Sequence, residues 1–255
     1  MSTAYDIPHL LILLVTGVAA GWINMLAGGG SNLTLPALMV LGLPADVANA
    51  TNRVSVLLQG VVGMAGFRNH GQLPTEDLPA ILLPLLLGGA IGAVAPSFAP
   101  IALLKPLLLG TMLTMTLVML LKPNTVVAPA GSRALTVAEK PSARFWLLLA
   151  GMYGGFVQAG VGFILISVLG GALRYDLVRS NALKLVCGCA FTTIALAIFL
   201  AQDLVLWIPG LVLSVGTMFG AHAGVRFAIS ARAGTLRFIL FITTACGTVV
   251  ALLSD

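Results

Sequence analysis

Residues Gly17–Arg53 read GVAAGWINMLAGGGSNLTLPALMVLGLPADVANATNR, an apolar stretch that three consecutive glycines interrupt. Each glycine of Gly28–Gly30 weakens a helix by about 1 kcal/mol, so the sequence predicts that the backbone unwinds there. Within a membrane, unwound backbone persists only where it is buried in protein or lines a watery cavity. The amides that begin the next helix would then prefer an anion, and Ser31 and Asn32 could cap that helix and donate to a ligand.

The same spacing of glycines and amides occurs twice, 134 residues apart. The two copies are Gly17-x3-Gly21-x2-Asn24-x3-Gly28 and Gly151-x3-Gly155-x2-Gln158-x3-Gly162. Steps of 4, 3 and 4 would place all the positions of each copy on one helical face. We therefore predict a duplicated membrane protein with a site at the duplication axis. A further pair, Gly88-x3-Gly92 and Gly216-x3-Gly220, is typical of close helix packing.

The composition indicates a protein that is dissolved in lipid. Apolar residues make up 59% of the chain and charged residues 8%, against roughly 45–50% and about 25% in soluble domains. The net charge of +5 comes from cations scattered between apolar segments, which is typical of topology determinants and not of a nucleic-acid groove. We expect an all-α, multi-pass membrane protein whose surroundings are the lipid bilayer, with no nucleic-acid partner.

Ten apolar segments are predicted, five on each side of a linker that contains prolines, serines and charges. The first repeat covers residues 1–121, the linker residues 122–141 and the second repeat residues 142–255. The segments are His9–Ala27, Ser31–Leu43, Asp46–Phe67, Asp77–Phe98 and Ile101–Leu121, then Ser142–Gln158, Val161–Leu173, Leu177–Ala201, Val205–Arg226 and Leu236–Ser254. The second segment of each half has 13 residues, fewer than the roughly 20 that span hydrocarbon.

The positions of lysine and arginine indicate whether the short segments cross the membrane. If they do not cross, the cations divide eight to five between the two sides. If they do, ten lie on one side and only Arg53 and Lys105 on the other, with Lys184 inside its segment. The second count fits the positive-inside rule and predicts a cytoplasmic linker, periplasmic termini and two inverted repeats. Whether the short segments span fully or are re-entrant stays open.

The third segment of each half begins with an aspartate suited to capping, followed by polar residues and one cation. The polar residues and cations are Asn49, Thr51, Asn52 and Arg53 after Asp46, and Asn181 and Lys184 after Asp176. A cation at this depth costs about 2.5–3.5 kcal/mol or more unless it has a partner. In an inverted repeat, Arg53 and Lys184 would meet at the midplane and bind a small anion. Alternatively, the cations snorkel to headgroups and the amides bond between helices.

Several absences narrow the function. No carboxylate lies at the centre of any segment, which argues against a buried carboxylate proton relay. The sequence has no zinc-protease, nucleophile-elbow or phosphate-loop motif, so we expect neither an enzyme nor a metal or cofactor. Cys187, Cys189 and Cys246 fit small core positions, and the alternative is a thiol that contacts a sulfur-containing substrate.

The glycine break, the turn Leu41–Pro44 and the run Ala48–Asn52 resemble the TauE/SafE sulfite exporter family, the toluene-sulfonate uptake permease group. A weaker echo at Gly151–Lys184 extends the resemblance over nearly the whole chain. The resemblance implies a bacterial inner-membrane transporter of sulfite, sulfonates or related sulfur oxyanions. The second half departs from the stronger pattern, because Leu183-Lys184 stands where Asn52-Arg53 stands in the first.

The sequence therefore predicts a secondary transporter that moves a small sulfur-containing anion by alternating access between inverted repeats. The residues expected to bind the anion are Asn24, Gly28, Gly29, Gly30, Ser31, Asn32, Asn49, Thr51, Asn52, Arg53, Gln158, Gly160, Gly162, Asn181 and Lys184. The substitution Arg53→Ala is predicted to abolish transport and leave membrane insertion intact. A passive anion channel and a non-transporting scaffold are the alternatives. The anion, its direction and any coupling to an ion gradient stay open.

Overall fold

The computed structural model describes residues 6–95, 110, 132–231 and 235. Within these residues the secondary structure is helical and contains no strand, as predicted. The helices of the first half are α1 (Ile7–Ala27), α2 (Ser31–Val40), α3 (Ala45–Asn69) and α4 (Leu78–Val94). Those of the second are α6 (Ser142–Phe156), α7 (Val161–Ile166), a π-helical continuation η3 (Ser167–Ala172), α8 (Leu177–Ala201) and α9 (Trp207–Ser230). The predicted segments Ile101–Leu121 and Leu236–Ser254 lie outside the described residues, apart from one residue in the former.

Three described helices are long and apolar enough to cross a membrane, namely Ile7–Leu26 of α1, α8 and α9. The helix α3 has 25 residues, but its first turns carry the predicted polar cluster, which lowers its hydropathy. The second segments are short, as predicted: α2 has 10 residues and α7 has six. The chain leaves α2 through a turn at Gly42, whose φ of 90° favours glycine.

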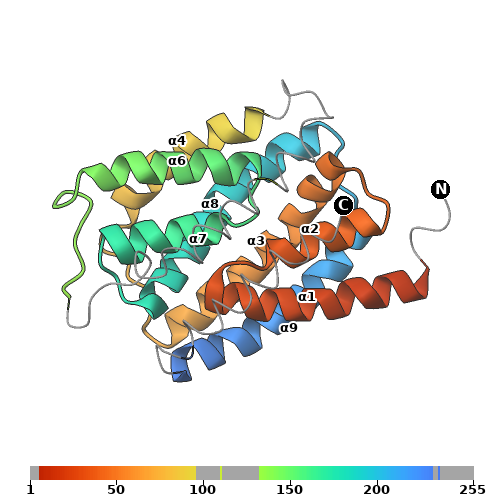
Figure 1. Ribbon diagram of the computed structural model, residues 1–255, viewed down its shortest axis with the longest axis horizontal. Coiled ribbons are helices and arrows are strands. Elements are labelled where there is room, and N and C mark those ends of the chain that lie inside the picture. Colours follow the sequence, from red (N-terminus) through yellow and green to blue (C-terminus); the bar gives the residue numbers. More distant parts are fainter. Residues whose placement is uncertain (1–5, 96–109, 111–131, 232–234, 236–255) are drawn as a thin grey trace.

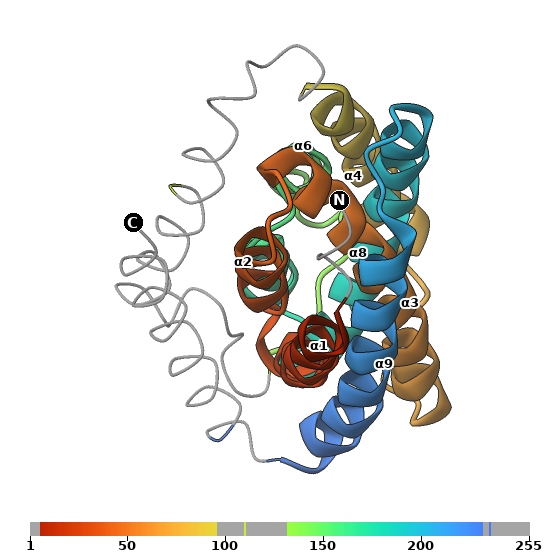
Figure 2. The same cartoon turned by 90° about the vertical axis from the view of Figure 1, so that its right-hand side faces the viewer.

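The helices pair across the two halves of the chain. The helix α1 packs along α9, and α4 packs along α6 at the other edge of the bundle (Figure 1). Between these pairs, α3 lies against α8 and α9, and α8 also contacts α4. Seen from the end of the bundle, α3, α8 and α9 line one side, and α1, α2 and α6 line the other (Figure 2). The first helix of each half therefore packs against the fourth helix of the opposite half.

Glycines bring these helix pairs into close contact. A Cβ added to Gly21 would collide with the backbone of Thr217, and one added to Gly220 would collide with Val18. In the α4–α6 pair, a Cβ on Gly92 would collide with the backbone of Met152. The packing interpretation of the Gly88 and Gly216 patterns is thus confirmed, and it extends to Gly17, Gly21, Gly151 and Gly155.

The prediction that each copy of the glycine-and-amide pattern occupies one helical face was wrong. The helix α1 ends at Ala27, so Gly28 lies beyond it, and α6 ends at Phe156, before Gln158 and Gly162. The reason is local, since Gly28 adopts a left-handed φ of 83° and Gln158 one of 65°, neither of which continues a helix.

The predicted helix caps are borne out in one case of three. Asp176 caps α8, and its carboxylate accepts a hydrogen bond from the amide of Arg179 at 2.9 Å. Asp46 lies within the first turn of α3, where Pro44 is the N-cap residue. The N-cap residue of α2 is Gly30, which has no side chain, and no other side chain caps that helix. Ser31 and Asn32 therefore do not have the predicted capping role.

Residues 132–141, the described part of the predicted linker, contact both the loop before α4 and the loop after η3. The amide of Val137 donates to Asp77 Oδ2 at 2.6 Å, and the amide of Leu135 donates to the Leu173 carbonyl at 2.8 Å. Val137 is buried. Close by, hydrogen bonds from Thr136 hold the pKa of the exposed Glu139 carboxyl below its ordinary value.

Candidate functional site

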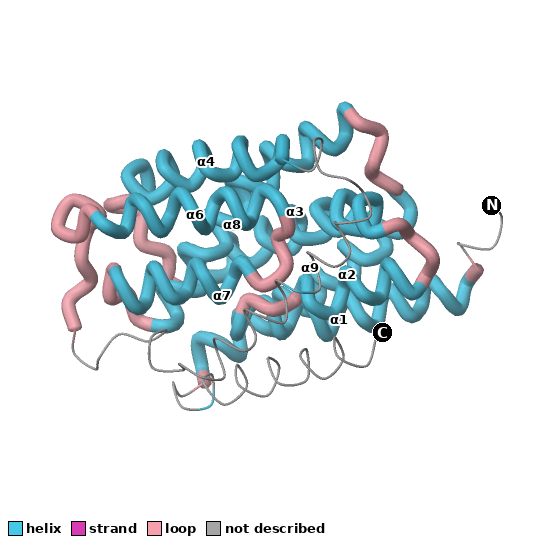
Figure 3. Tube along the Cα trace, turned by 45° about the horizontal axis from the view of Figure 1, so that its top comes forward, coloured by secondary structure: helices cyan, strands magenta, loops and turns pink. Residues whose placement is uncertain are grey.

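Two interruptions of helix meet inside the bundle. One joins α1 to α2 and the other joins α6 to α7, and both are drawn as loops in its interior (Figure 3). Their backbones touch, because a Cβ placed on Gly28 would lie 3.0 Å from the Cα of Gly162. Only residues without side chains permit this approach, so the two glycines set the distance between the halves at this point.

Gln158 occupies an unusual position in the second interruption. Its φ of 65° is in the left-handed region that non-glycine residues rarely adopt, and Gly160 follows with a φ of 74°. The side chain is buried, and its amide nitrogen donates to Thr192 Oγ1 on α8 at 3.3 Å. Its amide oxygen Oε1 has no hydrogen-bond partner among the described residues. A strained residue with an unused buried acceptor is more often found in binding sites than in packed cores.

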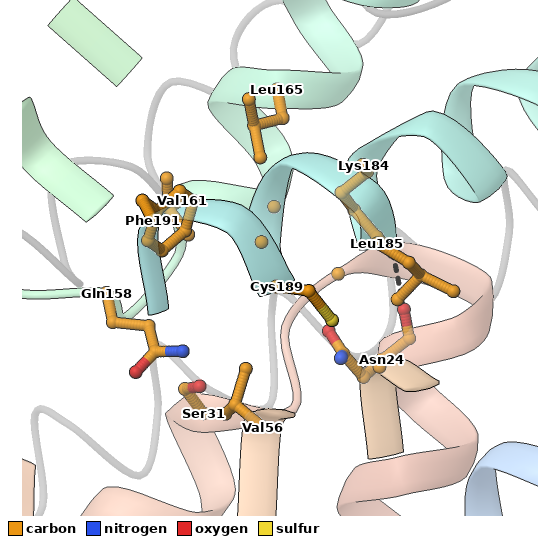
Figure 4. Close-up of a pocket in the computed structure, with 14 residues that line it drawn as sticks. Asn24, Ser31, Val56, Gln158, Val161, Leu165, Lys184, Leu185, Cys189 and Phe191 are labelled. Atoms are coloured by element: carbon orange, nitrogen blue, oxygen red, sulfur yellow. Dashed lines mark hydrogen bonds between the residues drawn. The ribbon is translucent and has the colours of Figure 1, made fainter. Parts of the chain in front are cut away.

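A cavity of about 30 Å³ lies where the two interruptions meet α1, α3 and α8. This volume holds about one water molecule. Figure 4 shows Gln158, Ser31, Asn24, Cys189 and Lys184 arranged around it. The residues that line the cavity are Asn24, Gly28, Ser31, Val56, Gly60, Gln158, Val161, Gly162, Leu165, Lys184, Leu185, Gly188, Cys189 and Phe191. Both halves of the chain therefore contribute to its wall.

Lys184 is the only cation among the described residues that line the cavity, and it is 3% exposed. Its ammonium donates to the backbone carbonyl of Asn24 at 2.5 Å and to Asn181 Oδ1 at 2.8 Å. Asn181 in turn donates from Nδ2 to the carbonyl of Leu26 at 3.1 Å. Lys184 and Asn181 thus satisfy carbonyls at the end of α1, where the helix dipole favours positive charge.

Arg53 has a similar place on the other half, at the end of α6. Its guanidinium donates to the carbonyls of Gly154 at 2.7 Å, Gly155 at 2.8 Å and Phe156 at 3.4 Å. Asn49 adds a hydrogen bond from Nδ2 to the Phe156 carbonyl at 3.1 Å. Arg53 is fully buried, and its guanidinium carbon lies 5.4 Å from the ring centroid of Phe199.

Neither buried cation has an acidic partner. The ion pairs among the described residues are Arg133 with Glu139 and Arg179 with Asp176, and both are exposed. No carboxylate lines the cavity in the described part of the chain, and no cluster of metal-ligating side chains is present there. The charge of Lys184 is thus balanced by carbonyl dipoles and by no carboxylate among the described residues, and an anion in the cavity would neutralise it.

The polar residues that follow Asn49 connect helices instead of lining the cavity. Asn52 accepts at Oδ1 from Thr34 Oγ1 at 2.6 Å and donates from Nδ2 to Ser31 Oγ at 3.3 Å. Thr51 accepts from the amide of Leu206, before α9, at 3.0 Å. Asn32 is buried with an unpartnered Oδ1 and is not among the lining residues. These contacts hold α2 and α9 against α3.

The structure brings six of the predicted binding residues to the cavity: Asn24, Gly28, Ser31, Gln158, Gly162 and Lys184. The remaining predicted residues, which do not line it, are Gly29, Gly30, Asn32, Asn49, Thr51, Asn52, Arg53, Gly160 and Asn181. Arg53 and Lys184 therefore do not converge on one cavity in this structure, although both are buried and neither reaches headgroups as in the alternative interpretation. That alternative was right about Asn49 and Asn181, whose amides bond between helices.

Sequence reasoning missed the wall that α8 contributes beyond Lys184. Gly188 follows Lys184 by four residues and Cys189 follows Leu185 by four, which places each one helical turn further along the face of its predecessor. That spacing was the available signal. Both Cys187 and Cys189 are buried, as the core interpretation predicted, and Cys189 also lines the cavity, whereas Cys187 packs beside α4 and α6. Cys246 lies outside the described residues.

These features define a class of protein, a multi-pass helical membrane protein with a buried cationic cavity between interrupted helices. The sequence model of the family described as Sulfite exporter TauE/SafE matches residues 13–251. The chain therefore belongs to this family of membrane transporters.

Curated bacterial relatives have names that agree with the family. A "Probable membrane transporter protein" of Haemophilus influenzae is 27% identical over 224 residues, which covers 87% of this chain and 86% of the relative. The "Probable membrane transporter protein ORF9" of Sinorhizobium is 26% identical, over 92% and 90% of the two chains. The "Probable membrane transporter protein YfcA" of Escherichia coli K12 is 25% identical, over 93% and 88%. No solved structure is significantly similar to the chain.

Proposed function

We propose that this chain is a secondary transporter that binds a small sulfur-containing anion, such as sulfite or an organosulfonate, in the cavity beside Lys184. The observation that carries the proposal is the buried ammonium of Lys184 at the cavity wall, without a carboxylate partner among the described residues. A charge in this position is expensive unless an opposite charge accompanies it. The family name supplies the sulfur oxyanion as the expected opposite charge.

The polar groups at the cavity suit an oxyanion. An ammonium has three N–H donors, and the two described acceptors of Lys184 leave one donor for a ligand. Ser31 and the amide of Asn24 add further groups that can donate, whereas the free Oε1 of Gln158 can only accept a hydrogen bond, for example from a substituent of the anion. Hydrogen bonds between a charged donor and an oxyanion are the stronger kind, so Lys184 would dominate the affinity.

We further propose that transport proceeds by alternating access between two inverted repeats of five segments, residues 1–121 and 142–255, joined by a linker at residues 122–141. The exchanged pairing of α1 with α9 and of α4 with α6 supports this proposal, because it is unchanged when the halves are interchanged. A cavity of about 30 Å³ is smaller than a sulfur oxyanion, so the protein must change conformation to bind one, as alternating access requires. A rigid open channel would instead have a continuous path through the protein from one side of the membrane to the other.

The distribution of cations in the sequence supports the membrane orientation that we propose, with the linker in the cytoplasm and both termini in the periplasm of a bacterial inner membrane. In this orientation α2 and α7 enter the membrane from opposite sides. The touching glycines Gly28 and Gly162 would then mark the level at which the halves move against each other.

The test is flux into proteoliposomes of the purified chain, with labelled sulfite, sulfate, methanesulfonate and chloride, and with or without sodium and pH gradients. The proposal predicts saturable flux of sulfur oxyanions that exceeds chloride flux, and acceleration by one gradient would identify a coupled ion. Flux that never saturates would favour a passive channel. Absence of flux for every anion, from protein that is folded by size-exclusion chromatography, would favour a scaffold and refute the proposal.

A further inference from the structure

Among the described residues, Gly188 differs from the glycines of the other long helices in what surrounds it. In α1, α3, α4, α6 and α9, a Cβ added to any glycine would lie within 3.3 Å of an atom beyond its own helical turn. These glycines are explained by close packing. A Cβ added to Gly188 would meet no such atom within 4 Å. Close packing therefore does not explain a glycine at this position of α8.

Glycine in the middle of a helix has a stability cost. Relative to alanine, it lowers helix stability by about 0.5–1 kcal/mol. Gly188 lies in the interior of the 25-residue helix α8, and its backbone has no positive φ that would require glycine. The open space beside it is the cavity, because Gly188 is one of the lining residues. A role in the cavity would account for the missing side chain.

Along α8, Gly188 lies midway between Lys184 and Thr192, the residue that holds Gln158. Lys184 and Thr192 are four residues before and after it, so the three share one face of α8. Thr192 holds the side chain of Gln158, whose unpartnered Oε1 is the buried acceptor at the other part of the cavity. Each step of four residues is about 6 Å along the helix, so a ligand that reaches from Lys184 towards Gln158 must pass over Gly188.

We propose that Gly188 is a specificity-determining residue that leaves room for the substituent of a substituted sulfur anion. This inference rests on the proposed function and refines its substrate class. The oxyanion group lies at Lys184, and the substituent lies over Gly188 in the direction of Gln158. An unsubstituted anion such as sulfite needs only the Lys184 end, whereas a short organosulfonate needs both.

The experiment compares wild type, Gly188→Ala and Gly188→Val in proteoliposomes with sulfite, methanesulfonate and 2-hydroxyethanesulfonate. A methyl group at residue 188 should leave sulfite flux close to wild type and lower 2-hydroxyethanesulfonate flux by about tenfold or more, with methanesulfonate between them. Valine should strengthen the same order. Folding is not at risk from Gly188→Ala, because alanine is the better helix former and meets no neighbour.

The matched control is Ala197→Val, which adds bulk at an exposed position of the same helix. It should leave flux of all three anions unchanged. If Gly188→Ala changes the three fluxes by the same factor, or if wild type carries sulfite but neither sulfonate, the inference about Gly188 is overturned while the proposed function stands. If wild type carries none of the anions, the proposed function itself fails.

Discussion

The ends of α1 and α6 are built alike but differ in what their cation faces. At each end, an asparagine and a cation from the third helix of the opposite half satisfy backbone carbonyls: Asn181 and Lys184 for α1, Asn49 and Arg53 for α6. Lys184 also lines the cavity. Arg53 donates to three carbonyls and lies over Phe199, its Nε has no hydrogen-bond partner among the described residues, and the residue does not line the cavity. Two helix ends with similar partners thus differ in one respect: the cation at the end of α6 contacts only protein, and the cation at the end of α1 also lies at a cavity.

The side chains explain the division of roles. A planar guanidinium can bind several carbonyls at once, which suits it to closing the end of α6. An ammonium is a compact charge that two acceptors do not exhaust, so Lys184 can serve both α1 and a ligand. Removing Arg53 should therefore affect folding first, and changes at the Lys184 cavity should affect transport first.

The largest effect is expected for Arg53→Ala. The substitution leaves the carbonyls of Gly154, Gly155 and Phe156 with fewer donors, at about 1–3 kcal/mol for each buried group left unsatisfied. We expect a strong fall in the thermal stability of the detergent-solubilised protein, measured by fluorescence-detected size exclusion. This loss of stability is expected in addition to the sequence-based prediction that Arg53→Ala abolishes transport and leaves membrane insertion intact. The control Arg68→Ala, at the end of α3, should be close to wild type, and equal stability of the two variants would contradict the capping role.

The next effect is expected for Gln158→Glu, which keeps the shape of the side chain and adds a negative charge at the cavity. The carboxylate would repel the anion and compete with it for Lys184, so the KM for sulfite should rise by about tenfold. Concentration-dependent flux in proteoliposomes measures it. The matched change Gln72→Glu lies in the loop after α3, outside the cavity-lining residues, and should leave the KM unchanged. An unaltered KM in Gln158→Glu would remove Gln158 from the site.

Cys189 supplies a reporter that is already in the cavity wall. In the double variant Cys187→Ser, Cys246→Ser, a small thiol reagent should label Cys189. A sulfonate concentration that fills about nine-tenths of the sites should slow this labelling by about tenfold. Mass spectrometry after timed quenching measures the rate. The control is a variant that keeps only Cys187. Because this thiol is in the core, it should react slowly, and the sulfonate should not change its rate. Labelling of Cys189 that ignores the anion would place the ligand elsewhere.

The smallest effect is expected for Thr192→Val, which removes the hydrogen bond between Thr192 and the Gln158 amide. The loss of one buried hydrogen bond is worth about 1 kcal/mol, so the KM for the anion should rise by about fivefold with little change in stability. The control is Thr193→Val, because Thr193 is at an exposed position of α8. A larger effect than that of Gln158→Glu would mean that Thr192 itself contacts the anion.

The sequence could predict the helices and much of the cavity because both depend on local signals. Apolar length and glycine runs placed eight of the ten segments close to the helices of the described chain. The glycines in the sequence predicted the two interruptions to which Gly28 and Gly162 belong. The repeated spacing of glycines and amides predicted that Asn24 and Gln158 belong to the site, and both line the cavity. The polar residues at the start of α8 predicted that Lys184 belongs to the site, because a cation within an apolar segment is costly and usually marks a functional site.

What the sequence could not predict is which backbone groups each cation would meet. Arg53 and Lys184 look equivalent along the chain, but their surroundings come from the end of a helix more than 100 residues away. The helix α6 ends at Phe156, two residues before the left-handed Gln158, and its last carbonyls accept hydrogen bonds from Arg53. Gly188 and Gly21 are both glycines in apolar segments, and only the packing of other helices distinguishes a cavity wall from a helix contact.

The most direct test of the cavity's function is sulfite flux by Lys184→Met, which keeps the length of the side chain and removes its charge. Wild type and variant would be reconstituted at equal density and compared for initial rate and saturation. Because hydrogen bonds that involve a charged group are worth about 1.5–3 kcal/mol, kcat/KM for sulfite should fall by about 10–100-fold while the protein stays folded. Flux by folded Lys184→Met that equals wild type would show that the buried ammonium does not bind the transported anion.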